Sequence, residues 1–245
     1  MNLTTSVKRT EEFNKVSAKN FYGRLLSKNP TIVDVGANKG QTIDIFTKIF
    51  PKSKIYAFEP SETYEFLKKK YKKNKNIKLS NLAVDRKSTK RKFYYHTFKS
   101  NNSSGLSGFY KINKNSKDHI RINSSARNEI LKNINHSFLV DCITLDDFFK
   151  KKEKIDLLKI DTQGNELNVL KGSKKLLKNI KFIRLELMFY DYYEKSYVFS
   201  DIELFLKKFN FKIFNILEVQ QNPINYKTDW IEVLFYNTKI SWIKK

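Results

Sequence analysis

The chain has 245 residues, of which 40% are hydrophobic and 14% aromatic, so its composition predicts a folded protein with a sizeable core and excludes a disordered one. The formal net charge of +23, from 48 Lys and Arg against 25 Asp and Glu, indicates either an anionic partner or a lysine-rich composition. The single Cys142 excludes an intramolecular disulfide and a cysteine-based zinc site, and no apolar run approaches the ~18 residues of a membrane-spanning helix. Because the first residues lack the apolar core of a signal peptide, we expect a cytoplasmic soluble protein.

Strand and helix patterns alternate along the chain. Near-continuous apolar runs predict buried parallel strands, and apolar residues at helical spacing predict the helices between them. In chain order the expected elements are a helix at 8–27, a strand at 31–36, a helix at 41–50, a strand at 54–60, a helix at 62–73, a strand at 77–84, a strand or hairpin arm at 91–98, a short strand from Ser137, a short helix near Thr144, a strand at 154–161, a helix at 164–179 interrupted at Gly172, a strand at 180–189, a helix at 200–209, and strands at 211–217 and 229–236.

This order predicts an α/β fold with a doubly wound, mostly parallel sheet. The chain closes with two strands that no helix separates, so we expect the last strand, around Trp230 to Tyr236, to run antiparallel to the others. We assign residues 1–29 to an N-terminal helical extension and residues 30–245 to one Rossmann-like domain. An irregular insertion is expected at about 99–136, where the sequence has no clean period and begins with loop-forming Asn, Ser and Gly.

A glycine turn follows the first strand. In "DVGANKG", Gly36 and Gly40 allow a tight turn and let a ligand approach the backbone at the start of the next helix. Asp34, just before the turn, is a poor neighbour for a pyrophosphate and suits a ligand that carries an ammonium group. Glu59, at the end of the second strand, is placed to accept hydrogen bonds from ribose hydroxyls. Local backbone bonds for Asp34 and a helix-entry role for Glu59 are the structural alternatives.

Several motifs together resemble one family. "DVGANKG", "YAFEP", "NLAV", "TLDDFF", "LLKIDTQGNELNVLKG" and "IRLELMFYDYY" follow, in order and spacing, the pattern of FkbM-type S-adenosylmethionine-dependent methyltransferases, over roughly residues 30–237. The resemblance implies a class I methyltransferase fold that mostly methylates hydroxyl oxygens of sugars, polyketides and other small molecules. It implies cofactor contacts from Asp34, Gly36, Asn38 and Gly40 at the methionine end, from Glu59 at the ribose, and from the turn Asn81 to Ala83 near the adenine. Asn165 departs from the pattern, which often has an aromatic residue or alanine there.

Methyl transfer to a hydroxyl needs a group that helps to remove the proton, such as a carboxylate, a histidine or a metal. Asp161 ends a central strand at the sheet edge where α/β folds bind ligands, and it is the leading candidate for a base or a ligand of a divalent metal. Its alternative role is to position the cofactor or the loop. Glu186, on the next strand, faces the same pocket or pairs with Arg184 or a lysine. His119, in the insertion, is a further candidate for contact with the substrate.

Three functions stay open. O-methylation of a hydroxyl on a sugar, glycan or other small molecule is the leading hypothesis. An RNA methyltransferase would use the charge of +23, but the fourth parallel strand ends in "IDTQG" rather than the proline–aromatic tetrapeptide of amino-methylating nucleic-acid enzymes, so no specific nucleic acid is expected. A non-catalytic binding protein with a cofactor fold is the third, and the intact Asp34, Gly36 and Glu59 argue against it.

Overall fold

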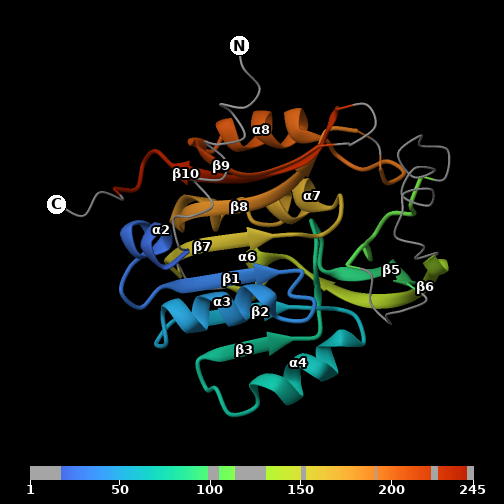
Figure 1. Ribbon diagram of the computed structural model, residues 1–245, viewed down its shortest axis with the longest axis horizontal. Helices are drawn as coiled ribbons and strands as arrows, with labels where there is room; N and C mark the ends of the chain where they lie inside the picture. Colours follow the sequence, from blue (N-terminus) through green and yellow to red (C-terminus); the bar gives the residue numbers. More distant parts are fainter. Residues whose placement is uncertain are drawn as a thin grey trace.

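The computed structural model describes residues 18–98, 105–113, 131–149, 153–190, 192–221 and 226–241. Its centre is a seven-stranded sheet in the order β3-β2-β1-β7-β8-β10-β9 (Figure 1). The strands are β1 Thr31–Val35, β2 Lys54–Phe58, β3 Ile77–Ser80, β7 Ile155–Ile160, β8 Ile180–Met188, β9 Phe211–Gln221 and β10 Thr228–Asn237. Strand β10 is antiparallel to both β8 and β9, whereas the pairs among β3, β2, β1, β7 and β8 are parallel. The predicted doubly wound sheet with an antiparallel last strand is confirmed.

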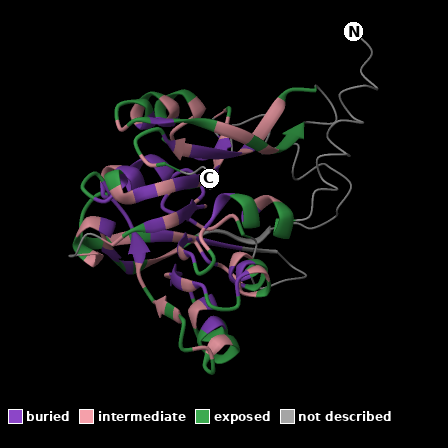
Figure 2. Cartoon of the chain, turned by 90° about the vertical axis from the view of Figure 1, so that its left-hand side faces the viewer, coloured by how far each residue is buried: buried purple, intermediate pink, exposed green. Residues whose placement is uncertain are grey.

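Helices cover both faces of this sheet, because alternate strand residues point to opposite sides and each side is apolar. One core packs α2 Ala18–Leu25, α3 Gln41–Ile49 and α4 Thr63–Tyr71 against one face. The other core packs α6 Leu145–Phe148, α7 Glu166–Lys171 and α8 Phe199–Lys207 against the opposite face. A short 3-10 helix, Leu177–Asn179, precedes β8. Figure 2 shows the buried residues concentrated in the strands and the exposed residues on the outer sides of the helices.

A second, three-stranded sheet lies beyond the carboxyl ends of the parallel strands (Figure 1). Its order is β4-β6-β5, with β4 Ala83–Val84, β5 Thr89–Phe98 and β6 Leu131–Ile143. The single strand expected at 77–84 is therefore wrong: the chain leaves the large sheet after Ser80, and Val84 pairs with Ile143 instead. Strand β6 also begins inside the range expected to be irregular, because its backbone pairs antiparallel with β5.

The described part of the N-terminal region is packed against the domain. In α2, Tyr22 and Leu25 are buried, and Leu26 directly after it is buried as well. All three belong to the core that α3 and α4 share with β1. Within the described residues, no helix combines the length and the apolar character needed to cross a membrane.

Candidate active site

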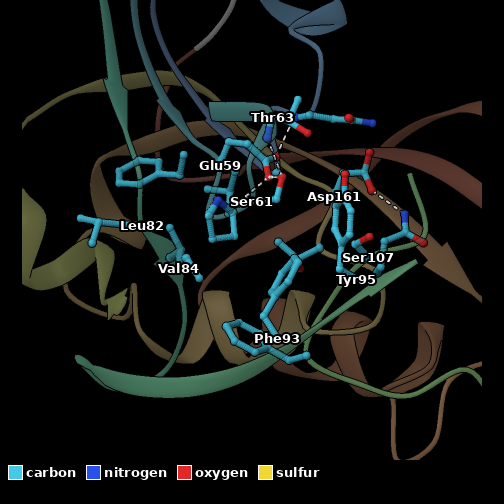
Figure 3. Close-up of a pocket in the computed structure, with 18 of the residues that line it drawn as sticks. Glu59, Ser61, Thr63, Leu82, Val84, Phe93, Tyr95, Ser107 and Asp161 are labelled. Carbon is cyan, nitrogen blue, oxygen red and sulfur yellow. Dashed lines mark hydrogen bonds between the residues drawn. The ribbon is translucent and has the colours of Figure 1, made fainter. Parts of the chain in front are cut away.

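A cavity opens at the carboxyl edge of the large sheet, between that sheet and the second one (Figure 3). Its walls come from the ends of β1 and β2, from β4 and β5, from residues 105–109, and from the loop after β7. The empty space between these walls, counted with the solvent at its open side, is about 650 Å³. The edge where the carboxyl ends of parallel strands meet is also the usual ligand edge of α/β folds.

The glycine turn forms the floor of this cavity between β1 and α3. Gly36 and Gly40 have φ of +83° and Asn38 has φ of +45°, a region that favours glycine. The amides of Gly36 and Ala37 both donate to the carbonyl of Phe58 at 3.0 Å, which ties the turn to the end of β2. A β-carbon on Gly36 would lie 1.9 Å from the backbone oxygen of Asp161. The turn therefore packs directly on the end of β7, with no room for a side chain.

Glu59 joins the turn to the segment that leads into α4. Its Oε2 accepts a hydrogen bond from the backbone amide of Asn38 at 2.8 Å. Its Oε1 accepts from the amide of Ser61 at 3.0 Å and from the Ser61 hydroxyl at 2.6 Å. A carboxylate has about four acceptor positions, so Glu59 keeps capacity for a ligand's hydroxyls. Glu59 lines the cavity although it is only 7% exposed, and Figure 3 shows it beside Ser61.

Asp34 lies beneath the turn rather than in the cavity wall. It is fully buried, and neither carboxylate oxygen has a hydrogen-bond partner among the residues that the structure describes. Its nearest charge is the Lys159 ammonium, which is 3.6 Å away and forms an ion pair beyond hydrogen-bond length. Burial raises the pKa of Asp34 to about 6, and Lys159 opposes that rise. Asp34 is therefore linked to the cavity residue Asp161 through the Lys159 ammonium, which pairs with both carboxylates.

Asp161, at the end of β7, is held on both carboxylate oxygens. Lys159 Nζ donates to Oδ2 at 3.1 Å, and Gln163 Nε2 donates to Oδ1 at 2.8 Å. Burial by itself lowers the pKa of Lys159, but Asp161 and Asp34 outweigh that effect and hold the pKa above its ordinary value. The Asp161 side chain lines the cavity and keeps 31% of its surface exposed, so a ligand can reach it.

Glu186, on β8, lies close to the Gln163 amide that also contacts Asp161. Gln163 Nε2 lies 3.4 Å from Glu186 Oε1, so one amide group faces two carboxyl groups. Burial, with the nearby charges of Asp161 and Glu166, raises the pKa of Glu186 to about 8. Glu186 is thus mostly protonated at neutral pH, and it does not line the cavity.

Glu166 fixes the loop that follows β7. Its Oε1 accepts from the amide and hydroxyl of Thr162, at 2.9 and 3.1 Å, and from the amide of Gly164 at 3.2 Å. The side chain is buried, and burial raises its pKa to about 7 against these hydrogen bonds. This arrangement holds Thr162 and Gln163 at the cavity, so Glu166 organises the loop from beneath.

The second sheet and residues 105–109 supply a wall that sequence reasoning missed. Phe93 and Tyr95 of β5, with Ser107 and Phe109, also line the cavity. The rings of Phe93 and Phe109 meet edge to face at 5.7 Å, and the Arg91 guanidinium lies 4.1 Å from the centre of the Phe109 ring. The alternation in "RKFYYHTF" carried a signal, because it puts Phe93 and Tyr95 on one face. No comparable pattern marks residues 105–109.

The structure brings about half of the expected site residues together. Gly36, Asn38, Glu59, Ala83 and Asp161 line the cavity. The expected residues that do not line it are Asp34, Gly40, Asn81 and Glu186. Gly40 packs on Tyr71 at the start of α3, and Asn81 is exposed while its neighbours Leu82 and Ala83 reach the cavity. His119 lies outside the described residues. In the part of the chain that the structure describes, no group of three or more His, Cys, Asp or Glu is arranged to hold a metal ion.

Comparisons with known proteins give the family. Residues 34–213 match the model of the methyltransferase FkbM domain. Methyltransferase FkbM from Methylobacillus flagellatus KT has a similar structure, with 12% identity and a TM-score of 0.51 over 93% of this chain and 52% of that chain. The present chain thus spans about half the length of that relative.

Other solved structures match this chain at lower similarity. An rRNA methylase from Streptococcus thermophilus is 11% identical, with 90% of this chain and 93% of that one covered and a TM-score of 0.44. M. capricolum TrmK in complex with S-adenosylhomocysteine is 13% identical, with 91% and 68% covered and a TM-score of 0.45. A search of curated protein sequences found no match. Because the family model covers most of the chain, this protein belongs to the FkbM family of methyltransferases.

Proposed function

We propose that this protein is an S-adenosylmethionine-dependent methyltransferase that methylates a hydroxyl oxygen of a sugar, a glycan or another small molecule. One observation carries the proposal. Glu59 and Asp161 line the same cavity from the ends of β2 and β7, the two strands that flank β1 and its glycine turn. Glu59, which is proposed to bind hydroxyl groups, and Asp161, the candidate base, therefore lie on either side of the glycine turn.

The residues of the cavity fit the cofactor. Glu59 retains acceptor capacity for ribose hydroxyls, and the turn at Gly36 and Asn38 offers backbone that a ligand can approach closely. Leu82 and Val84 give an apolar wall suited to a base ring (Figure 3). When bound, S-adenosylmethionine supplies an electrophilic methyl group on a sulfonium.

Asp161 is the base in this proposal. The hydroxyl proton must leave as the new oxygen–carbon bond forms, and Asp161 accepts it on a carboxylate oxygen. Lys159 and Gln163 donate hydrogen bonds to the two carboxylate oxygens of Asp161, whereas burial keeps Glu186 protonated at neutral pH.

A transfer screen tests the proposal. The full chain is incubated with methyl-labelled S-adenosylmethionine and hydroxylated sugars, sugar nucleotides, lipid-linked glycans or RNA. We expect label on a hydroxyl acceptor, and Asp161→Asn should lower turnover by ~10²–10⁴-fold, the usual contribution of a general base. Asp141→Asn, which changes an exposed carboxylate on β6, is the matched control and should keep full activity.

Three outcomes would count against this assignment. Near-wild-type turnover in Asp161→Asn would remove Asp161 as the base. A loss on chelation that a divalent cation restores would make Asp161 a metal ligand instead. Label on RNA alone would replace the small-molecule acceptor with the nucleic acid that the charge of +23 favours.

A further inference from the structure

Gln163 occupies an unusual place in the loop after β7. It has φ of +55°, a region that a residue with a side chain seldom adopts. Its side chain is 8% exposed and lines the cavity next to Asp161. Such a conformation costs about 1–3 kcal/mol and persists where the surroundings over-determine it, commonly at functional sites.

The surroundings determine which way the Gln163 amide points. The Tyr193 hydroxyl donates to Gln163 Oε1 at 2.6 Å, which occupies the acceptor end of the amide. The donor end then faces Asp161 Oδ1 at 2.8 Å and Glu186 Oε1 at 3.4 Å. A reversed amide would put its oxygen against the Asp161 carboxylate, and two acceptors would then face each other. The Asp161 carboxylate, which only accepts hydrogen bonds, therefore selects the orientation in which Gln163 donates to it, and the Tyr193 hydroxyl holds the Gln163 oxygen that this orientation presents.

Tyr193 is itself fixed from outside the cavity. Its side chain is fully buried and is not part of the cavity wall. Its hydroxyl lies 3.2 Å from the carbonyl oxygen of Leu106, and its backbone forms a bridge with Ile112. Both contacts come from residues 105–113, the segment that also places Ser107 and Phe109 in the cavity. The Asp161 carboxylate is thus connected through the side chains of Gln163 and Tyr193 to residues 105–113.

We propose that Gln163, held at its Oε1 by the Tyr193 hydroxyl, is a positioning residue that holds the Asp161 carboxylate toward the acceptor. This inference rests on the proposed function. Lys159 holds one oxygen of Asp161 and Gln163 holds the other, so the carboxylate cannot rotate and its free acceptor positions keep one direction. The titratable and charged groups that face Glu186, the other carboxyl group on this amide, are Asp161, Glu166, Lys159, Tyr193 and, directly opposite on β10, Glu232.

Three variants test the proposal. Gln163→Leu removes the donor, and Tyr193→Phe removes only the hydroxyl that holds the Gln163 oxygen. Tyr192→Phe is the matched control, since its buried hydroxyl has no hydrogen-bond partner among the described residues and its ring packs on Tyr193 at 4.8 Å. Circular dichroism and thermal unfolding establish that each variant is folded.

The first readout needs neither cofactor nor acceptor. Carbon-13 labelled Glu and Asp side chains are titrated by NMR, with Glu186 and Asp161 identified by their loss in Glu186→Gln and Asp161→Asn. Because the Gln163 hydrogen bond lowers the pKa of Glu186, Gln163→Leu should move the Glu186 titration upward by roughly half to one unit. Tyr193→Phe should give a smaller shift in the same direction, and Tyr192→Phe should give none.

The second readout is turnover with the acceptor that the screen identifies. Gln163→Leu and Tyr193→Phe should lower kcat by roughly tenfold, move the rising limb of the pH–rate profile to higher pH, and leave cofactor affinity unchanged. Equal effects in Tyr192→Phe and Tyr193→Phe, or wild-type titration and profiles in both Tyr193→Phe and Gln163→Leu, would overturn the proposal. An NMR shift without any methyl transfer would uphold the hydrogen-bond arrangement and overturn the proposed function instead.

Discussion

The carbonyl oxygen of Asp161 lies only 1.9 Å from the position that a β-carbon on Gly36 would take. The glycine turn after β1 and the end of β7 thus touch through backbone alone. From the sequence, a side chain at Gly36 was expected to intrude on the ligand, but the structure shows that it would first collide with the protein itself. The turn and the base candidate are therefore one structural unit.

Gly36→Ala should destabilise the fold as well as the site. The new methyl group would overlap a backbone atom, and φ of +83° would strain any residue other than glycine. We expect the free energy of unfolding to fall by at least ~2 kcal/mol, measured by urea denaturation. Gly23→Ala is the control: nothing lies within 4 Å of its β-carbon in α2, so it should be neutral or stabilising. Equal stability of Gly36→Ala and wild type would contradict the packing described.

Lys159→Met should lower the free energy of unfolding, because it removes the ion pair with Asp34. The variant leaves the fully buried Asp34 carboxylate without its nearest positive charge. Removal of one partner of a buried pair commonly costs ~3–5 kcal/mol. The double variant Asp34→Asn with Lys159→Met should recover part of this loss, because no unpaired charge then stays buried. Guanidinium unfolding of the two single variants and the double variant measures the coupling, and strictly additive losses would show that the pair does not interact.

Stability should fall as pH rises from about 5 to 8. Burial raises the pKa of Glu166 to about 7 and of Glu186 to about 8, from 4.5. The folded state therefore binds more protons than the unfolded state in this window, and each group lowers the free energy of unfolding by up to ~1.4 kcal/mol per pH unit. Urea denaturation across this range measures the slope.

Glu186→Gln should flatten that slope, because the amide does not titrate. Glu65→Gln serves as the control, since Glu65 is exposed on α4 and its change should leave the slope as in wild type. A stability that is constant or rises between pH 5 and 8 would show that these carboxyl groups do not keep their protons in the folded state.

The sequence was sufficient for the large sheet. The apolar runs at β1, β2, β7 and β8 need burial on both faces, and the closing pair β9 and β10 lacks a crossover helix, so the mostly parallel sheet and its antiparallel strand follow from general rules. Glu59 and Asp161 were also predictable, since both end parallel strands and such ends meet at one edge.

The second sheet and the buried charges were not predictable in the same way. Val84 pairs with Ile143, 59 positions later, and no local pattern encodes that contact. Asp34 occupies a strand position that resembles a ligand contact, yet its side chain points to Lys159 on the neighbouring strand. Tyr193 follows β8 in the aromatic run "FYDYY", and its hydroxyl binds Gln163. These roles depend on strand register, which sequence patterns fix poorly.

A substitution of Glu59 tests most directly whether the cavity binds S-adenosylmethionine. Its Oε2 accepts from the Asn38 amide and its Oε1 from Ser61. In Glu59→Gln the new NH₂ group must face one of these donors, so a hydrogen bond is lost at the point where the ribose hydroxyls are expected. Glu65→Gln keeps the same chemical change on an exposed surface and is the matched control.

The decisive measurement is a calorimetric titration of S-adenosylmethionine into the full chain and these two variants. We predict saturable binding to wild type and Glu65→Gln, and an affinity lower by roughly 1–3 kcal/mol in Glu59→Gln, the strength of a hydrogen bond to a charged group. Absence of binding to wild type, or equal affinity in a folded Glu59→Gln variant, would contradict the assignment of this cavity to the cofactor.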